Sequence, residues 1–571
     1  MFKHLRSSFL GAIPTLILGL LLLFGCTTGQ LGKKQAPTFK NGMVVCAHPE
    51  AAQAGIEILR KGGNAIDAAV AVQFALAVVY PEAGNIGGGG FMVYRSANGE
   101  SNTLDFREKA PELATKNMYL DSLGNPIPGL SLTGYLAVGV PGSVAGMWEA
   151  HQKYGKLSWK TLLKPAIRLA KGGFKITNNQ ARSLNNHQIN FRTENPKSNY
   201  LVKVNAWKVG DILTQEDLAK TLELIQENGK DGFYKGETAN LIVDQMKKNS
   251  GIITMNDLKN YNAIWRKPLI GTYKGYKVIA MPPPSSGGVA LLQILKMLEP
   301  YQLSKFRFHQ APAVQLITEA EKRAYADRAK YLGDPDFYHV PTTLLLDSSY
   351  LKSRMKNFSW NRATPSAEIL AGKFDIKESE QTTHFSIVDR DGNAVSITTT
   401  LNGSYGSKVF VNGAGFLLNN EMDDFSMKPG VPNMYGLVGG VANAIEPKKR
   451  MLSSMTPTII EKNGKLFMVV GSPGGSTIIT TVFQTISNVI DYQMNIQKAV
   501  DEKRFHHQWL PDEIQEEAGT LNNSTKSTLI HKGYLIKDRA PIGRCDAILL
   551  NQWGYLEGGA DPRGDDAKMG Y

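Results

Sequence analysis

Alternating apolar and polar residues predict two neighbouring β-strands in the second half of the chain. Over residues 382–388, Phe385 and Ile387 occupy one face and small polar side chains occupy the other. Residues 394–401 repeat this pattern, with a second apolar face set against serine and threonine. Both segments are therefore predicted to be half-buried strands of one hairpin.

The connection between these strands fixes their register. Asp389 to Asn393 suits a three-residue loop in which Gly392 takes the left-handed conformation. If Asp389 pairs with Asn393, Thr382 faces Thr400, with β-carbons roughly 4.5 to 5.5 Å apart. Neighbouring hydroxyl groups are typical either of a threonine nucleophile or of an ordinary cross-strand threonine pair.

The rest of the chain alternates between helical and extended patterns. We predict helices over residues 51–60, 65–79, 143–153, 160–171, 216–226, 288–298, 314–331 and 476–492. We predict further strands over residues 91–95, 277–281, 415–419, 458–462, 465–470, 547–551 and 554–557. Helices dominate the N-terminal two-thirds of the chain, and hairpins dominate the remainder. Such segregation indicates an α+β fold in which helices cover the faces of sheets.

Residues 359–381, directly before the hairpin, show no sustained period. They carry Pro365, Gly372 and charges of both signs, which is typical of a surface segment. A cut in the backbone would be tolerated here.

Composition indicates an ordinary globular protein and argues against a nucleic-acid-binding protein. The 571 residues are 42% hydrophobic and 20% charged, as in ordinary globular proteins. The net charge of +13 comes from lysines and arginines that are scattered among acids. No dense basic run is interleaved with aromatics, so we expect a solvated surface and no nucleic-acid partner.

The N-terminus has the pattern of an export signal. Lys3 and Arg6 precede an apolar stretch over residues 9–24, which is too short for a comfortable transmembrane helix. Leu23-Phe24-Gly25-Cys26 resembles a bacterial lipobox, in which the cysteine becomes the lipidated N-terminus of the mature protein. Ordinary signal-peptide cleavage is the alternative, because Phe24 is uncommon in that motif. We therefore predict a signal peptide over residues 1–25 and an exported protein that Cys26 tethers to a membrane, facing the periplasm or cell exterior.

The other cysteines and the histidines indicate no cofactor. Cys46 and Cys545 are too few for a disulfide scaffold, and the sequence leaves open whether they pair. The adjacent His506 and His507 lack the spacing of metal ligands. Neither a metal nor an organic cofactor is predicted.

Six segments, in their order along the chain, resemble those of γ-glutamyltranspeptidases, and the likeness extends over residues 42–571. They are Asp105-Phe106-Arg107-Glu108, the run from Pro282 to Gly288, Gln381-Thr382-Thr383-His384, the run from Asn419 to Phe425, Leu452-Ser453-Ser454-Met455, and the run from Gly471 to Ser476. The resemblance implies the four-layered αββα sandwich of N-terminal nucleophile hydrolases. It also implies two autocleaved subunits, a large one over residues 26–381 and a small one over residues 382–571.

The implied chemistry depends on cleavage of the chain. A threonine hydroxyl needs a base, and an N-terminal threonine supplies its own α-amine, with a pKa of about 7.7 to 8. The resemblance implies that Thr382 attacks the carbonyl of Gln381 and so releases itself as a new N-terminus. Thr382 would then take the γ-glutamyl group of glutathione or a related amide and pass it to water, an amino acid or a dipeptide.

The resemblance also assigns roles around Thr382. Thr400 would orient the nucleophile, and the N–H groups of Gly474 and Gly475 would hold the oxyanion at the start of a helix. Without the resemblance, these residues would be a silent threonine and a simple turn.

Substrate binding is assigned in the same way. Arg107, Ser453 and Ser454 would bind the α-carboxylate, for which a guanidinium is well suited. The α-ammonium would be bound by Asn402, Glu421 and Asp424, and a lid loop over residues 429–440 would carry Tyr435. The alternatives are a surface arginine, a solvated acidic turn and a plain loop.

Two other functions fit parts of the sequence. A cephalosporin (glutaryl) acylase of the same superfamily would share the nucleophile, although the lid is typically missing there. A tethered binding lipoprotein would hold a γ-glutamyl or peptide ligand without cleaving it. The sequence does not predict the balance of hydrolysis and transfer, the physiological acceptor or the oligomeric state.

Overall fold

Two antiparallel sheets of seven strands each form the centre of the unit Thr38–Tyr571. The first has the order β1 (Thr38–Phe39), β20 (Leu556–Gly559), β19 (Asp546–Leu550), β15 (Lys465–Gly471), β14 (Thr458–Lys462), β9 (Tyr276–Ala280) and β8 (Leu269–Tyr273). The second has the order β21 (Ala567–Gly570), β2 (Met43–Cys46), β10 (Thr383–Val388), β11 (Ala394–Thr400), β3 (Gly89–Arg95), β4 (Ser101–Phe106) and β7 (Ile264–Arg266). The computed structural model describes residues 37–195, 199–369, 382–428, 430–431, 433–434 and 436–571.

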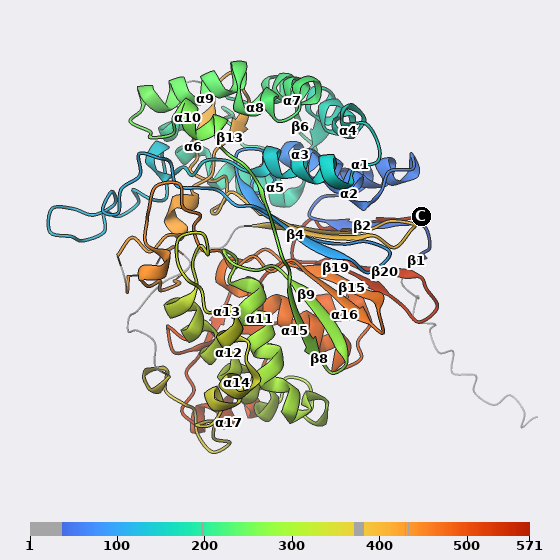
Figure 1. Ribbon diagram of the computed structural model, residues 1–571, viewed down its shortest axis with the longest axis vertical. Coiled ribbons are helices and arrows are strands. Elements are labelled where there is room, and N and C mark those ends of the chain that lie inside the picture. Colours follow the sequence, from blue (N-terminus) through green and yellow to red (C-terminus); the bar gives the residue numbers. More distant parts are fainter. Residues whose placement is uncertain (1–36, 196–198, 370–381, 429, 432, 435) are drawn as a thin grey trace, which may run out of the picture. The chain divides into compact units, whose positions relative to one another are not determined.

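Helices cover the outer face of each sheet, so the layers run helix, sheet, sheet, helix (Figure 1). Over the second sheet lie α1 (Pro49–Arg60), α2 (Ala65–Val79), α3 (Ser143–Tyr154), α4 (Trp159–Gly172) and α7 (Glu216–Asn228). Over the first lie α11 (Gly287–Leu298), α12 (Ala311–Tyr331), α15 (Ile478–Ile490) and α16 (Ile496–Asp501). The predicted αββα sandwich is confirmed.

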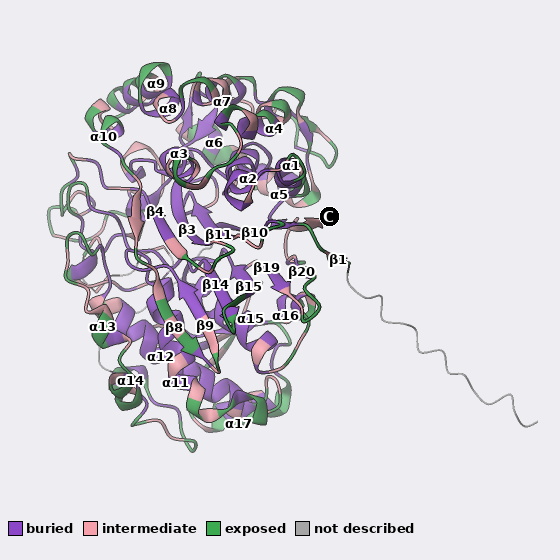
Figure 2. Cartoon of the chain, turned by 45° about the vertical axis from the view of Figure 1, so that its right-hand side comes forward, coloured by how far each residue is buried: buried purple, intermediate pink, exposed green. Residues whose placement is uncertain are grey.

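Shorter elements surround these layers. The remaining helices are α5 (Asn178–Asn186), α6 (Gln188–Glu194), α8 (Asp231–Tyr234), α9 (Gly236–Lys248), α10 (Met255–Lys259), α13 (Thr342–Leu345), α14 (Ser348–Arg354) and α17 (Asn523–His531). Three small sheets pair β5 (Phe174–Lys175) with β6 (Ile212–Leu213), β12 (Phe410–Val411) with β13 (Phe416–Leu417), and β16 (Phe505–His506) with β17 (Ile514–Glu517) and β18 (Ile536–Arg539). Exposed residues concentrate on the outer helices and loops (Figure 2).

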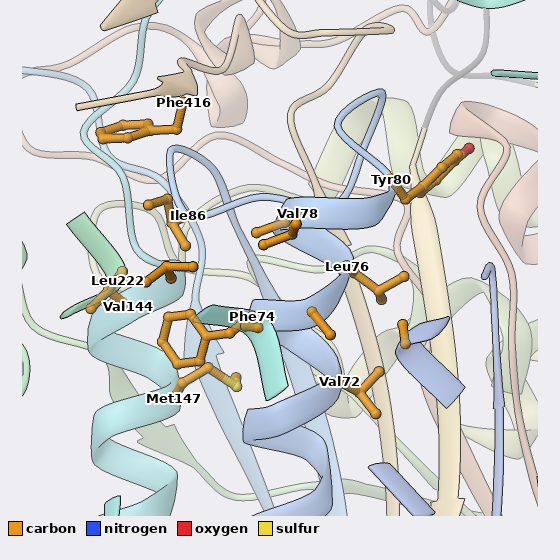
Figure 3. Close-up of a cluster of buried hydrophobic side chains, with 14 of the residues drawn as sticks. Val72, Phe74, Leu76, Val78, Tyr80, Ile86, Val144, Met147, Leu222 and Phe416 are labelled. Carbon is orange, nitrogen blue, oxygen red and sulfur yellow. The ribbon is translucent and has the colours of Figure 1, made fainter. Parts of the chain in front are cut away.

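The helix α2 is buried along its whole length, as its apolar sequence predicts. Its first turn is closed by a capping box, in which Asn64 and Asp67 each accept the other's backbone N–H. Figure 3 shows Phe74 of this helix beside Val144 and Met147 of α3. A helix that is apolar on every side can therefore sit between other helices and a sheet.

The central hairpin has the predicted register. β10 pairs with β11 from Thr383 opposite Thr399 to Val388 opposite Ala394. The loop closes as expected, with Gly392 at a φ of +88°.

The polar face of this hairpin lies between the two sheets. Ser386 Oγ donates to the carbonyl of Asp546 in β19 at 3.0 Å, and Ser396 Oγ donates to the carbonyl of Val470 in β15 at 3.1 Å. The opposite face, which includes Phe385, packs into the helix-covered core. Because buried polar groups must find partners, these bonds hold the hairpin against the first sheet and fix the position of its end.

Strands from both sides of residue 381 alternate within the second sheet. β2 precedes that point in sequence, yet it lies between β21 and β10, which follow it. A break between the two parts would therefore leave them interlocked through one sheet. The boundaries at residues 25 and 381 themselves stay predictions.

Most predicted elements are confirmed, with small differences at their ends. The first part of the chain is less helical than predicted, because it also supplies β2, β4, β7 and β8 to the two sheets. The helix predicted over 476–492 starts with a 3-10 turn at Gly475–Thr477 before α15. Within the predicted surface segment, residues 359–369 include exposed positions and a short 3-10 helix at Ser366–Glu368, and residues 370–381 lie outside the described residues.

The structure also bears on the two cysteines and on membrane-spanning helices. Cys46 and Cys545 are both buried and carry free thiols. Among the residues that the structure describes, every helix is too short or too polar to cross a bilayer. The signal segment and Cys26 lie outside the described residues.

Candidate active site

The end of the hairpin carries the candidate nucleophile. Thr382 comes directly before β10, and the register of the hairpin ends at Thr383 opposite Thr399, so Thr382 and Thr400 are the next residues along the two strands. Both residues are almost fully buried, with exposed fractions of 5% and 2%, and both line one pocket. The predicted juxtaposition of the two threonines is therefore present.

The hydroxyl of Thr400 has a defined orientation. Its Oγ1 accepts the backbone N–H of Asn402 at 2.7 Å. Asn402 adopts a left-handed φ of +72°, which turns the chain back toward Thr400. Because this oxygen already accepts one bond, its own hydrogen is available to a partner across the hairpin, where Thr382 lies.

Most of the predicted site residues line the same pocket as Thr382, whose empty space is about 280 Å³. They are Thr400, Arg107, Asn402, Glu421, Asp424, Ser453, Ser454 and Gly475. Leu437 of the predicted lid loop also lines it, whereas Tyr435 lies outside the described residues. Segments that are far apart in sequence thus converge on one small polar pocket.

Gly474 lies on the other side of Thr382. It lines a second pocket together with Thr382, Gly543 and Arg544. Gly474 and Gly475 have φ angles of +133° and +53°, conformations that other residues rarely adopt. A β-carbon on Gly474 would also lie 2.6 Å from Thr477 Oγ1. The turn before α15 therefore requires glycine.

Arg107 is buried at the centre of an acidic cluster. Its guanidinium forms ion pairs with Glu421 and Asp424, and a longer one of 3.5 Å with Glu108. Burial alone would lower its pKa, but the carboxylates of Glu421 and Asp424 raise it above the ordinary value. The surface alternative for Arg107 and the solvated-turn alternative for residues 421–424 are both wrong.

Glu108 and Glu421 are buried carboxyl groups that share Arg107 as a partner. One oxygen of each, Oε1 of Glu108 and Oε2 of Glu421, has no donor among the described residues. Burial raises the pKa of Glu108 to about 7 and that of Glu421 well above its usual range. Because the two carboxyl groups share one cation, they titrate together, and burial favours a state in which the pair holds a proton.

Arg328 of α12 also lines the pocket, and the sequence did not single it out. It lies in a helix correctly predicted over 314–331, but nothing in the periodicity distinguishes it from the other cations of that helix. The sequence also assigns no role to Glu108, the neighbour of Arg107. It assigns none to Ser286, which accepts a hydrogen bond from Arg328 Nε.

Comparison with known proteins shows to which family this chain belongs. The family model described as Gamma-glutamyltranspeptidase matches residues 51–571. This chain belongs to the γ-glutamyltranspeptidase family. Among the described residues of this family member, no group of three or more histidines, cysteines, aspartates or glutamates is placed to hold a metal ion.

Individual relatives of this γ-glutamyltranspeptidase include hydrolases and acylases. It is 50% identical to the glutathione hydrolase proenzyme of Escherichia coli (strain K12), over 93% of this chain and 92% of the relative. It is 36% identical to the acylase ACY 1 proenzyme of Pseudomonas sp. (strain V22), over 93% and 94% of the two chains. The crystal structure of a cephalosporin acylase from Bacillus halodurans superimposes with a TM-score of 0.82 at 27% identity, over 96% of this chain and 99% of that one.

Proposed function

We propose that this γ-glutamyltranspeptidase transfers the γ-glutamyl group of glutathione and other γ-glutamyl amides to water, amino acids or peptides. The observation that carries the proposal is the position of Thr382. It lines one pocket with Thr400, Gly475, two arginines and two carboxylates, and a second pocket with Gly474. This arrangement suits a zwitterionic acyl group attached to a threonine ester.

The first step is self-cleavage of the bond between Gln381 and Thr382. The Thr382 hydroxyl adds to the carbonyl carbon of residue 381, and the C–N bond breaks to give an ester and a free α-amine. Water then hydrolyses the ester, which releases the carboxyl end of the large subunit and restores the hydroxyl. The new amine has a pKa of about 7.7 to 8, so it can accept a proton near neutral pH.

Catalysis repeats the chemistry on a substrate. Thr382 Oγ attacks the γ-carbonyl carbon, and its α-amine takes the hydroxyl proton and delivers it to the leaving amine. The backbone N–H groups of Gly474 and Gly475 stabilise the oxyanion, with support from the dipole of the helix that follows. Water or an acceptor amine then attacks the ester and returns Thr382 to its starting state.

Thr400→Ala is expected to lower kcat by about 100-fold or more, because it removes the hydrogen bond to the nucleophile. It also leaves the N–H of Asn402 without its acceptor, at a cost of about 1 to 3 kcal/mol of stability. Thr400→Ser keeps the hydroxyl and is the matched control. Release of p-nitroaniline from γ-glutamyl p-nitroanilide, normalised to cleaved enzyme, measures the effect. An alanine variant with undiminished turnover would refute the role of Thr400.

The pocket also supports a pH prediction. As pH rises from 6 to 8, the pair of Glu108 and Glu421 loses its proton, since burial raises the pKa of Glu108 to about 7. The additional negative charge attracts the substrate ammonium, so KM should fall by about fivefold, which corresponds to ~1 kcal/mol. In Glu108→Gln the KM should not change between pH 6 and pH 8, and it should stay near the value that the wild-type enzyme has at pH 6. If KM changed with pH equally in the wild-type enzyme and in Glu108→Gln, the pair of Glu108 and Glu421 would be excluded as the cause of the pH dependence.

The charge of the pocket argues against the acylase alternative. A glutaryl group carries a carboxylate but no ammonium, so Glu421 and Asp424 would gain no partner from it and would repel it. The test compares glutamate release from glutathione, with and without glycylglycine, against release from a glutaryl amide. Faster turnover of the glutaryl amide would favour the acylase. Failure to turn over either substrate, in a protein that remains one full-length band on a denaturing gel, would favour a binding lipoprotein.

We also propose that Cys26 is lipidated and holds the enzyme on a membrane facing the periplasm or cell exterior. The proposal rests on the basic start, the apolar stretch and the motif ending at Cys26. Cys26→Ser should move the activity from the membrane fraction to the soluble fraction. Unchanged membrane association in that variant would contradict lipidation as the anchor.

A further inference from the structure

Arg328 is a buried cation in the substrate pocket, and it forms no ion pair with any described residue. Its side chain is only 4% exposed. No carboxylate of the described residues lies within 4.0 Å of its guanidinium, whose hydrogen bonds go to the hydroxyls of Ser286 and Ser454. Burial lowers the pKa of Arg328 to about 10, although the group stays charged at neutral pH. Asp424 of the same pocket attracts this charge from beyond ion-pair distance, but its carboxylate is in contact with Arg107. A desolvated charge that no counter-ion contacts is costly, and a ligand of opposite charge would compensate it.

The other cation of the pocket is already neutralised. Arg107 is paired with Glu421, Asp424 and Glu108, so this end of the pocket carries excess negative charge even when one proton is shared. A substrate carboxylate that approached Arg107 alone would meet three acids. A second positive charge is therefore needed for the pocket to accept an anionic group, and Arg328 supplies it.

The hydrogen bonds of Arg328 also determine the direction of neighbouring hydroxyls. Arginine only donates, so Ser454 Oγ accepts from Nη2 at 3.1 Å, and its own hydrogen must point elsewhere. Ser286 Oγ accepts from Nε at 2.9 Å and donates to the carbonyl of Ser453 at 2.6 Å. Because Ser454 lines the pocket, its hydrogen is available to a bound carboxylate.

We propose that Arg328 is the positioning residue for the substrate's α-carboxylate, acting through its charge, which no carboxylate contacts directly, and through Ser454. This inference rests on the proposed function, and it adds a second cation to the one that the sequence predicts. Arg107 then acts on both charged groups of the substrate, because the acids that it contacts are those that bind the ammonium. Arg328 acts on the α-carboxylate alone.

The test uses substrates that lack one charge each. Kinetics are measured with γ-glutamyl p-nitroanilide, with 4-aminobutyryl p-nitroanilide, which has no α-carboxylate, and with glutaryl p-nitroanilide, which has no α-ammonium. Arg328→Gln should raise KM for the γ-glutamyl and glutaryl compounds at least about tenfold, as expected for a lost hydrogen bond to a charged group. KM for the 4-aminobutyryl compound, or its inhibition constant where turnover is too slow to follow, should change less than about twofold by the same argument. kcat and self-cleavage should be preserved.

Control variants separate charge from structure. Arg328→Lys keeps the charge and should recover most of the affinity, and Lys330→Gln, an exposed cation of the same helix, should behave as wild type. If Arg328→Gln does not fold, Ser454→Ala should show the same dependence on the α-carboxylate. Once Ser454 is removed, Arg328→Lys should have little further effect.

The outcomes distinguish this inference from the proposed function. An equal loss of affinity for all three compounds, or an unchanged KM for γ-glutamyl p-nitroanilide, would overturn the role of Arg328 and leave the function standing. A wild-type enzyme that is inert toward every γ-glutamyl compound would instead contradict the function itself.

Discussion

Thr382→Ala is expected to yield a single uncleaved chain with no measurable release of p-nitroaniline from γ-glutamyl p-nitroanilide. The side chain supplies the attacking oxygen twice, first for self-cleavage and then for substrate. Loss of a catalytic nucleophile lowers turnover by about 10⁶-fold in other acyl-transfer enzymes. Here the effect is compounded, because the α-amine that serves as the base never forms.

The neighbouring threonine provides a matched control. Thr383 lies on the opposite face of the strand, and its buried Oγ1 has no hydrogen-bond partner among the residues that the structure describes. Thr383→Val replaces that hydroxyl by a methyl group of similar volume and should preserve cleavage and turnover. Denaturing gels and p-nitroaniline release measure both variants. Normal cleavage in Thr382→Ala would assign the nucleophile to another residue.

Arg107→Lys should raise KM for γ-glutamyl p-nitroanilide by at least about 30-fold, which corresponds to ~2 kcal/mol for a lost charged contact in a buried site. Lysine keeps the positive charge but cannot pair with Glu421 and Asp424 at the same time, as the planar guanidinium does. Arg107→Ala is less informative, because it leaves buried carboxylates uncompensated and should destabilise the fold by about 3 to 5 kcal/mol.

Steady-state kinetics on cleaved protein measure this effect, and thermal unfolding establishes that the variant is folded. Lys116→Gln, an exposed cation of the same part of the chain, is the control and should leave KM unchanged. A wild-type KM in Arg107→Lys would remove Arg107 from the substrate site and leave Arg328 as its principal cation.

The sequence predicts the hairpin well because two independent signals agree there. The alternation of residues fixes which face is buried, and the loop ending at Gly392 fixes the register, so the position of Thr382 opposite Thr400 follows. Helix α2 is equally clear, since fifteen consecutive buried residues leave no polar face to misassign. These elements depend on local pattern alone.

Other features depend on contacts between distant segments. The strand β2 has only four residues, all apolar and all buried, so its period is indistinguishable from that of a short helix segment. The burial of Arg107 likewise cannot be read from its neighbours in sequence, because its partners Glu421 and Asp424 lie more than 300 residues away. The importance of Arg328 comes from its burial without an ion pair to any described residue, which only the folded chain reveals.

The central claim is that cleavage converts Thr382 into an N-terminal residue that activates itself. N-terminal sequencing of the purified, active enzyme tests it most directly. We expect a fragment that begins Thr-Thr-His-Phe, in an amount equal to that of the large subunit. Full activity in a protein that lacks this terminus, or whose second fragment begins at another residue, would show that Thr382 is not the terminal nucleophile.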